Sequence, residues 1–198
     1  MVTALLKTPS GSRRLDLFAL KQEAGHNPRR LAAIRERLLD HARAGALFCP
    51  ACGGPVQPQL GDLGPWRFVH AKPSSNCPLA SSRVRDLTKH ALADELTRRY
   101  GGRVKRLRID VPLPTRHGQV LWTPVAAQVD GLERVYEIWE EDRETVEEAK
   151  WRTQTHEAAG REVLWVLLKT SPHSPVYAWL EREARPYWTA IQEYVDAR

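Results

Sequence analysis

The chain has 198 residues, of which 42% are hydrophobic, and this length suits one domain or a small module followed by one domain. A formal net charge of +6 favours an acidic partner, most commonly nucleic acid, although a merely basic protein without such a partner fits equally well. No run of about 18 apolar residues is present, which excludes a membrane-spanning helix, and the first apolar run is too short for a secretory signal. We therefore expect a cytoplasmic protein, in which three cysteines are better read as metal ligands than as disulfide partners.

The first elements expected along the chain are helices. A short helix is predicted over residues 15–24. Asn27 and Pro28 begin a second helix, because an Asn side chain can cap a helix and Pro is tolerated at its first position. Apolar residues then recur at helical spacing, which predicts an amphipathic helix over residues 28–44 that ends at Gly45.

Residues 48–78 show no apolar period and are rich in Gly, Pro and Cys, so this segment needs a source of stability other than a core. A helix is predicted from residue 81 or 82 to residue 100. Turn signals at His117-Gly118 and Asp130-Gly131 separate strands at 104–111, 119–129 and 134–139. A helix at 141–159, a strand at 162–168 and helices at 176–184 and 186–195 follow. A helix between two strands of one sheet predicts a crossover and an α/β core.

A cysteine pair lies in the segment that lacks a core. Cys49 and Cys52 are two residues apart and precede two glycines, a spacing that lets both thiolates bind one tetrahedral ion. His70 and Cys77 are the nearby residues that can complete the set. Four such ligands leave no open position, so we predict a structural zinc ion that supplies folding energy here. The alternative is a lone cysteine pair beside an unrelated histidine.

Acidic residues near strand ends point to a second kind of site. Metal-dependent nucleases hold one or two divalent ions on carboxylates at the ends of adjacent strands. Glu137 lies in an apolar stretch, where an unused carboxylate is costly, and is the best catalytic candidate. Asp130, Asp110 and Gln128 are the further candidates, with Mg²⁺ as the cofactor. The alternative for Glu137 is a carboxylate that pairs with an arginine.

Basic residues on the first predicted strand suggest a contact with nucleic acid. Arg103, Lys105, Arg106 and Arg108 could follow a phosphate backbone. The alternative is a strand edge that charge protects from pairing with other strands.

Together these patterns resemble the competence protein CoiA-like family, over roughly residues 40 to 170. The family's Cys-Pro-x-Cys is matched by Cys49-Pro50-Ala51-Cys52, and its later His and Cys are matched by His70 and Cys77. Its Glu-Ile-Gln strand is matched by Glu137-Ile138-Trp139. Its helix with Arg-Thr-x-x-Tyr is matched by residues 152–156, where His156 replaces the Tyr.

The resemblance implies a zinc-finger-like module followed by a PD-(D/E)XK nuclease domain that acts on DNA. Two core positions differ from the family. Its metal-binding Asp falls on Gln128, and its Gln falls on Trp139. An amide ligates a cation poorly compared with a carboxylate, which leaves two hypotheses: an active nuclease, or a relative that binds DNA without cutting it.

We therefore predict an α/β fold with a restriction-endonuclease-like core, an N-terminal helix and a small zinc-binding module. The expected parts are an N-terminal helical segment at 1–46, the zinc-binding module at 47–80, the nuclease-like core at 81–170 and C-terminal helices at 171–198. The expected function is DNA binding or processing, with no membrane partner. The rival is a non-catalytic, zinc-containing adaptor that binds nucleic acid or another protein.

Overall fold

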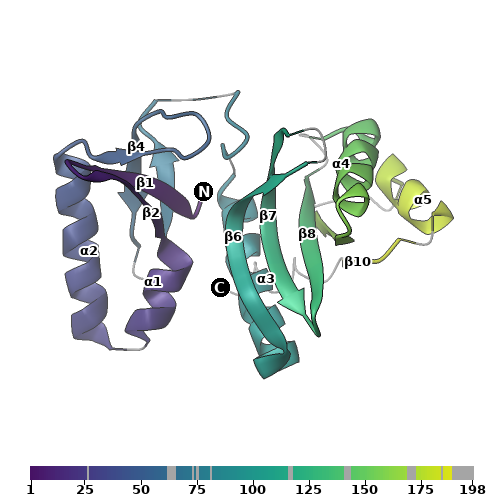
Figure 1. Cartoon of the computed structure of the whole chain (residues 1–198), viewed down its shortest axis with the longest axis horizontal. Coiled ribbons are helices and arrows are strands. Elements are labelled where there is room, and N and C mark those ends of the chain that lie inside the picture. The colour runs from purple at the N-terminus through teal and green to yellow at the C-terminus, as the bar shows by residue number, and fades with distance from the viewer. Residues whose placement is uncertain are drawn as a thin grey trace. The chain divides into compact units, whose positions relative to one another are not determined.

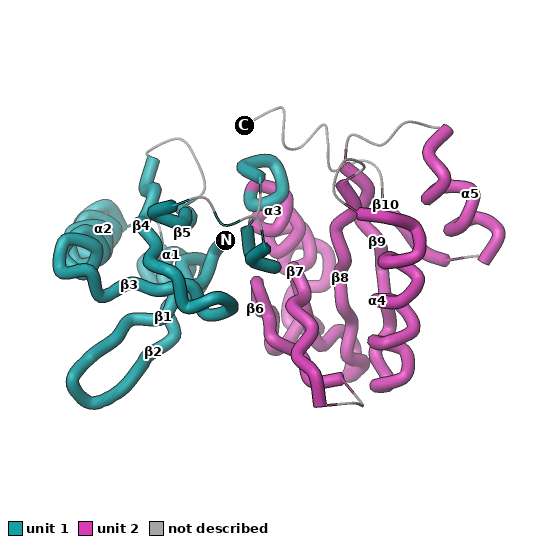
Figure 2. The backbone as a smooth tube through the Cα atoms, turned by 90° about the horizontal axis from the view of Figure 1, so that it is seen from above, with its two compact units in different colours: residues 1–86 teal, residues 87–198 magenta. Residues whose placement is uncertain are grey.

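The computed structural model describes residues 1–25, 27–61, 66–72, 74, 76–80, 82–115, 118–140, 144–168, 173–183 and 185–188. The chain divides into two compact units, unit 1 at Met1–Asp86 and unit 2 at Leu87–Arg198 (Figure 2). Among the helices in the described part of the chain, none is both long and apolar enough to cross a membrane.

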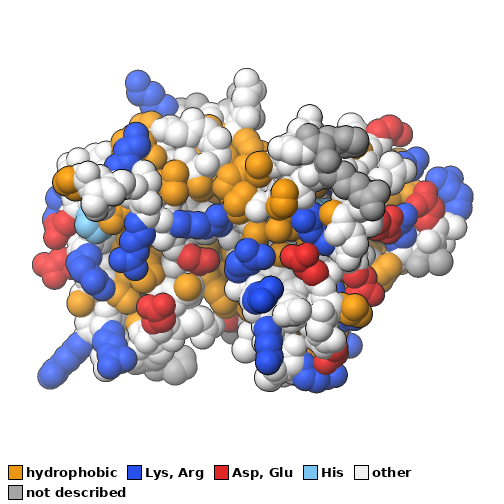
Figure 3. Space-filling view, viewed as in Figure 1, with side chains coloured by type: hydrophobic (Ala, Val, Ile, Leu, Met, Phe, Trp, Pro, Cys, Tyr) orange, Lys and Arg blue, Asp and Glu red, His pale blue; other side chains and the backbone are white. Residues whose placement is uncertain are grey.

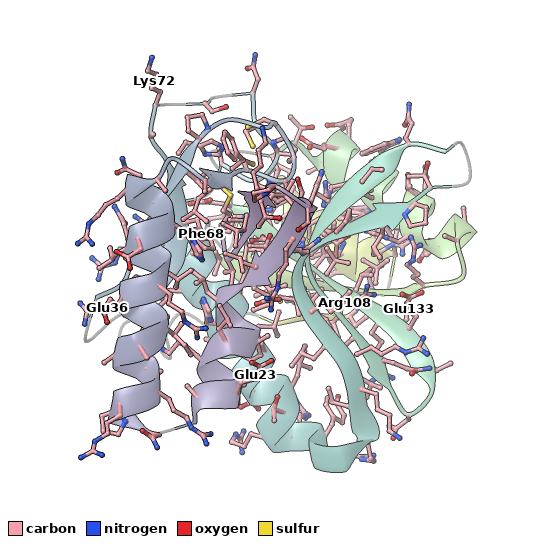
Figure 4. All side chains as sticks on the ribbon, turned by 60° about the vertical axis from the view of Figure 1, so that its left-hand side comes forward. Glu23, Glu36, Phe68, Lys72, Arg108 and Glu133 are labelled. Carbon is pink, nitrogen blue, oxygen red and sulfur yellow. The ribbon has the colours of Figure 1, made fainter. Side chains whose placement is uncertain are left out.

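Unit 1 combines a small sheet, two helices and a second hairpin (Figure 1). In the sheet, β1 (Thr3–Thr8) lies between β2 (Gly11–Asp16) and β3 (Leu47–Phe48). The helices are α1 (Leu17–Ala24) and α2 (Pro28–Arg43), and the hairpin pairs β4 (Val56–Gln59) with β5 (Arg67–His70). Phe68 of β5 is fully buried, and Figure 4 shows it beside α2.

Helix α2 confirms the prediction made from its cap and its apolar spacing. The Asn27 side chain accepts hydrogen bonds from the backbone N–H groups of Arg29 and Arg30. Ile34 and Leu38, one turn apart, are the buried residues of the helix. The short helix expected at residues 15–24 is present as α1.

Strands β1 and β2 differ from the helical segment expected at the N-terminus. They pair antiparallel from Thr3 and Asp16 at one end to Thr8 and Gly11 at the other. The edge strand β2 buries only Leu15, so backbone hydrogen bonds hold it more than side-chain burial does. Such a strand shows little alternation of apolar and polar residues, which is the pattern from which strands are predicted. The short strands β4 and β5 escape prediction for the same reason.

Unit 2 is a five-stranded mixed sheet with helices. Helix α3 (Arg83–Tyr100) begins at the end of unit 1 and runs on through unit 2 to a 3-10 turn at Gly101–Arg103. The sheet order is β10-β9-β8-β7-β6. The strands are β6 (Val104–Pro114), β7 (Val120–Val129), β8 (Leu132–Glu140), β9 (Glu162–Leu168) and β10 (Tyr187–Trp188), and the remaining helices are α4 (Val146–Ala158) and α5 (Pro175–Arg182).

The strand connections confirm the predicted crossover. Strand β7 pairs antiparallel with both β6 and β8, whereas β8 and β9 run parallel and are joined through α4. Asp130 and Gly131, which link β7 to β8, have φ angles of 52° and 86°. Two successive positive φ angles are what a tight two-residue hairpin requires. The fold is thus a mixed α/β fold, as expected.

The C-terminal segment corrects one prediction. A helix was expected at residues 186–195, yet Tyr187–Trp188 forms a short strand parallel to β9. The backbone N–H of Trp165 also donates to the Pro186 carbonyl at 3.2 Å. Without β10 the backbone groups on this edge of β9 would lack partners, and pairing with them outweighs the local helical pattern. Residues 189–198, His117 of the expected turn and residues 141–143 of the expected helix start lie outside the described residues.

One face of the unit 2 sheet forms a core with α4 and α5. Its centre is aromatic: Trp165 lies edge-to-face with Trp139 at 6.4 Å and with Trp179 at 6.0 Å between ring centroids. Val135 and Ala149 are buried in the same cluster. Because side chains alternate along a strand, Glu137 shares the face of β8 that carries Val135 and Trp139. Helix α4 therefore covers the best catalytic candidate.

Candidate metal centre and carboxylate network

Four predicted ligands converge in unit 1. Cys49 follows β3, Cys52 lies in the turn before β4, and His70 ends β5. Cys77 comes from the loop between β5 and α3. The donor atoms of these four residues all lie within 4.8 Å of one another. The prediction that they form one group is confirmed.

The turn between the first two cysteines is shaped to bring their sulfurs together. The Cys49 N–H donates to the Gly54 carbonyl at 2.8 Å, and the Gly53 N–H donates to the Cys49 carbonyl at 2.9 Å. Gly53 has a φ of 69°, a conformation that favours glycine. A Cβ at Gly54 would lie 3.4 Å from the Cys52 Sγ and 3.7 Å from the His70 ring, so this glycine packs directly against two of the four predicted ligands.

The distances within the cluster suit a tetrahedral ion. Cys49 Sγ lies 3.5 Å from Cys77 Sγ, and Cys52 Sγ lies 3.3 Å from His70 Nε2. Zinc–sulfur bonds of 2.3 Å in a tetrahedron would separate two sulfurs by about 3.8 Å. All three cysteines are free thiols. A Cys3His cluster of this geometry could bind zinc, and its four donors would leave no coordination position open.

Burial shifts the pKa values of the side chains in the Cys3His cluster. Burial raises the pKa of the Cys49 thiol to about 12, and burial also raises the pKa of Cys77. Burial opposes ionisation of Cys52 as well, but the backbone N–H of Gly54 and hydrogen bonds from the other thiols lower the pKa of Cys52 overall. Burial lowers the pKa of His70, which keeps its imidazole in the neutral form that binds metal. A metal ion binding here would displace the protons of Cys49 and Cys77.

Glu137 is fully buried on β8 and both its oxygens are engaged. Arg152 of α4 donates to Oε2 from Nη2 at 2.7 Å and from Nε at 3.0 Å. His156, one turn further along α4, places Nε2 at 2.9 Å from Oε1. Burial favours the protonated carboxyl, but the guanidinium of Arg152 and the hydrogen bond from His156 hold the pKa of Glu137 below its usual value. The pairing with an arginine that was the alternative for this residue is present.

The network around Glu137 extends into β7. His156 Nε2 lies 3.2 Å from the Thr123 hydroxyl, and Arg152 Nη2 donates to the Trp122 carbonyl at 2.7 Å. The other ring nitrogen of His156, Nδ1, is buried and has no hydrogen-bond partner among the described residues. Sequence reasoning placed both α4 residues only by family resemblance. The periodic signal that could have found them is their four-residue spacing, which puts them on one helix face.

The other catalytic candidates lie elsewhere. Asp110 is buried and pairs with Lys89 of α3 at 2.7 Å, and Asp130 lies in the β7–β8 turn, 3.3 Å from Arg103. Gln128 pairs with Glu133 across the ladder, four residues from Glu137 and thus roughly 13 Å away along β8. The structure does not bring these four candidates to one point. Among the described residues, the Cys3His cluster is the one group of three or more His, Cys, Asp or Glu side chains within metal-binding reach.

A pocket of about 590 Å³ lies at the carboxyl end of β8. Its lining includes Trp139, which stands at the family's Gln position, and Ser174 at the start of α5. Trp139 Nε1 and Ser174 Oγ are buried, and neither has a hydrogen-bond partner within the described part of the chain. Glu144 and Glu147 also line the pocket, which would repel a phosphate. Sequence reasoning missed this pocket, because it joins segments about thirty residues apart.

The basic residues of β6 lie on the outer edge of the sheet. Lys105, Arg106 and Arg108 are exposed, and Figure 4 labels Arg108 on this strand. Arg106 has a φ of 52°, and the pairing with β7 shifts register between Lys105 and Arg108. Charge together with a bulge is a common means of keeping an edge strand from pairing with another chain. The geometry thus favours edge protection for these residues.

Comparison with known proteins gives no family assignment. No family model matches the chain, and no curated protein matches it either.

Proposed function

We propose that the chain is a zinc-stabilised DNA-binding protein, related to the PD-(D/E)XK nucleases, that no longer cleaves its substrate. The observation that carries the proposal is the set of hydrogen-bond partners around the buried carboxylate of Glu137. Arg152 and His156 satisfy both oxygens of this buried carboxylate, so it has no free oxygen with which to hold a divalent ion.

The order of elements supports the relation to nucleases. Helix α3, the antiparallel strands β6 to β8, helix α4 and the parallel strand β9 follow the order expected for a restriction-endonuclease-like core. Arg152 and His156 match the Arg and Tyr positions of the CoiA-like helix, and both contact Glu137. The resemblance therefore involves residues that touch in space, although they lie far apart in the sequence.

The charges around Glu137 support the loss of cleavage. A nuclease ion needs one or two carboxylates with open coordination positions. Here the guanidinium of Arg152 neutralises the carboxylate, and the neighbouring strand β7 contributes to this network the hydroxyl of Thr123, which lies 3.2 Å from His156 Nε2. Asp110 and Asp130 have cationic partners of their own. In this proposal a fixed positive charge on α4 replaces the metal.

A protein-binding adaptor is the second candidate. It is favoured by acidic residues at the start of α4, where Glu144 and Glu147 line the pocket and Glu148 is exposed. Such a surface suits a basic or apolar segment of another protein better than a phosphate backbone. Under this alternative the zinc cluster would serve folding alone.

One assay separates these possibilities. The zinc-loaded chain is mixed with labelled single- and double-stranded DNA, with and without Mg²⁺ or Mn²⁺, between about 50 and 200 mM salt. We expect binding that weakens as salt rises, and intact DNA in every lane. Metal-dependent cleavage that disappears in Glu137→Gln would disprove the loss of cleavage. An absence of binding at the lowest salt would favour the adaptor.

A further inference from the structure

The positive charge of the chain belongs to one of its two units. Unit 1 holds thirteen Lys and Arg residues against six Asp and Glu residues, a net charge of +7. Unit 2 holds seventeen against eighteen, a net charge of −1. In Figure 3, Lys and Arg side chains recur over the part of the surface around α2, whereas Asp and Glu gather toward α4 and α5. A phosphate backbone is attracted to the first surface and not to the second.

Within unit 1, the exposed side of α2 concentrates unpaired cations. Arg29, Arg30 and Arg37 are exposed, and none of them forms an ion pair with another described residue. We call these three residues the α2 arginine face. In contrast, Arg43 is held by Asp40 at 2.8 Å. Figure 4 shows nitrogen-tipped side chains projecting outward along this helix.

The spacing of the α2 arginine face suits a repeating anion. Arg30 and Arg37 are seven residues apart, so they lie on the same side of the helix about 10.5 Å from each other. Both positions border the stripe of Ile34 and Leu38 that the helix buries, since Arg30 lies one turn before Ile34, yet both arginine side chains are exposed. The guanidinium groups are therefore free to make bidentate contacts with phosphate oxygens. The apolar stripe and the Asn27 cap hold the helix in place.

The basic residues of β6 serve as the contrasting case. Lys105, Arg106 and Arg108 carry the same three charges and are equally exposed, but they belong to a bulged edge strand of the unit without net positive charge. Their charge is already explained by its role in keeping the edge strand β6 from pairing with strands of other chains.

We propose that the α2 arginine face of unit 1 is the surface that binds the phosphate backbone of nucleic acid, and that β6 of the nuclease-like unit is not. This inference rests on the proposed DNA-binding function and assigns that function to the unit that carries the Cys3His cluster. The contact would be made to phosphates, so it would be independent of base sequence.

The test compares two matched triple variants of the full zinc-loaded chain. One variant combines Arg29→Gln, Arg30→Gln and Arg37→Gln, and the other combines Lys105→Gln, Arg106→Gln and Arg108→Gln. Binding of a labelled duplex is measured by fluorescence anisotropy over a salt series. Each lost phosphate contact lowers the slope of log affinity against log salt by about 0.9. We expect the α2 variant to lose about 2 to 3 in slope and the β6 variant to keep the slope of the unmodified chain.

A third variant, which combines Arg29→Lys, Arg30→Lys and Arg37→Lys, retains the charge and should keep most of the slope of the unmodified chain. Circular dichroism and zinc content show that each variant is folded. A slope lowered by the β6 substitutions, and unchanged by the α2 substitutions, would overturn this inference while DNA binding itself stands. Failure of the unmodified chain to bind DNA at low salt would overturn the proposed function, and this inference with it.

Discussion

At the scale of single residues, Arg152 balances the charge that unit 2 buries. Its guanidinium donates twice to Glu137 and once to the Trp122 carbonyl, and its side chain is only 14% exposed. Removing one partner of a buried ion pair leaves an uncompensated charge, which costs far more than an exposed pair contributes. The stability of this site thus requires that Glu137 and Arg152 are both present, because either one alone would be a buried charge without a partner.

We predict that Arg152→Ala lowers the free energy of unfolding by about 3–5 kcal/mol, measured by urea denaturation. The matched control is Arg134→Ala, whose partner Glu162 on the neighbouring strand is 52% exposed. The control should lose no more than about 1 kcal/mol. Equal losses in the two variants would mean that Glu137 does not depend on Arg152.

The lowered pKa of Glu137 gives the stability of unit 2 a defined pH dependence. A carboxyl whose pKa is depressed by folding contributes stability at neutral pH, and that contribution is lost as the pH falls through the folded pKa. We therefore expect the free energy of unfolding to decline once the pH falls below the ordinary value of 4.5 for this carboxyl. Glu137→Gln cannot titrate and should show a shallower decline, measured by denaturation at a series of pH values. Parallel curves for the two proteins would contradict this assignment.

For the helices and strands, short sequence signals correctly predicted the features that neighbouring residues determine, such as helix starts and tight turns. The cap and first-turn pair Asn27-Pro28 predicted the start of α2, and the Asp130-Gly131 turn predicted the β7–β8 hairpin. The strand predicted at 162–168 is present as β9, and its continuous apolar run suits a strand that has a neighbour on each side. Strand β2 could not be predicted in this way, because its pairing with β1 depends on backbone groups and not on side-chain pattern.

The cap of α2 allows a quantitative test of one such local signal. Asn27 Oδ1 accepts from the N–H groups of Arg29 at 3.1 Å and Arg30 at 3.2 Å. Asn27→Ala leaves both groups without that partner and should cost about 1 kcal/mol in thermal or urea unfolding. Asn27→Asp keeps an accepting oxygen and should retain nearly full stability. If both variants were equally destabilised, the side-chain cap would not be the cause.

At the scale of the whole molecule, the two candidate sites differ in how far sequence could predict them. The Cys3His ligands were predictable because a two-residue spacing fixes Cys49 and Cys52 in one turn, and few other donors lie nearby. The carboxylate candidates depend on strand register. The ladder that pairs Gln128 with Glu133 places Gln128 far from Glu137, and no local pattern specifies that offset.

The two units also differ in what stabilises them. Unit 2 buries a cluster of three tryptophans, whereas residues 48–80 of unit 1 connect short strands through the Cys3His cluster. Where two units unfold independently, a ligand stabilises only the unit that forms its site, and we expect this of the two units here. Loss of zinc should therefore loosen unit 1 and leave the tryptophan cluster of unit 2 intact.

Hydrogen exchange of the zinc-loaded and chelator-treated chain tests this expectation. We predict that chelation, or Cys49→Ser, removes protection from the amides of Cys49, Gly53 and Phe68, all of which donate backbone hydrogen bonds in unit 1. The amides of β9 should keep their protection, because their hydrogen bonds to β8 lie in the other unit. Exchange that rises equally in β9 would show that zinc stabilises the chain as one cooperative body. Unchanged exchange at all these amides, with zinc removed, would show that the cluster does not need its ion to fold.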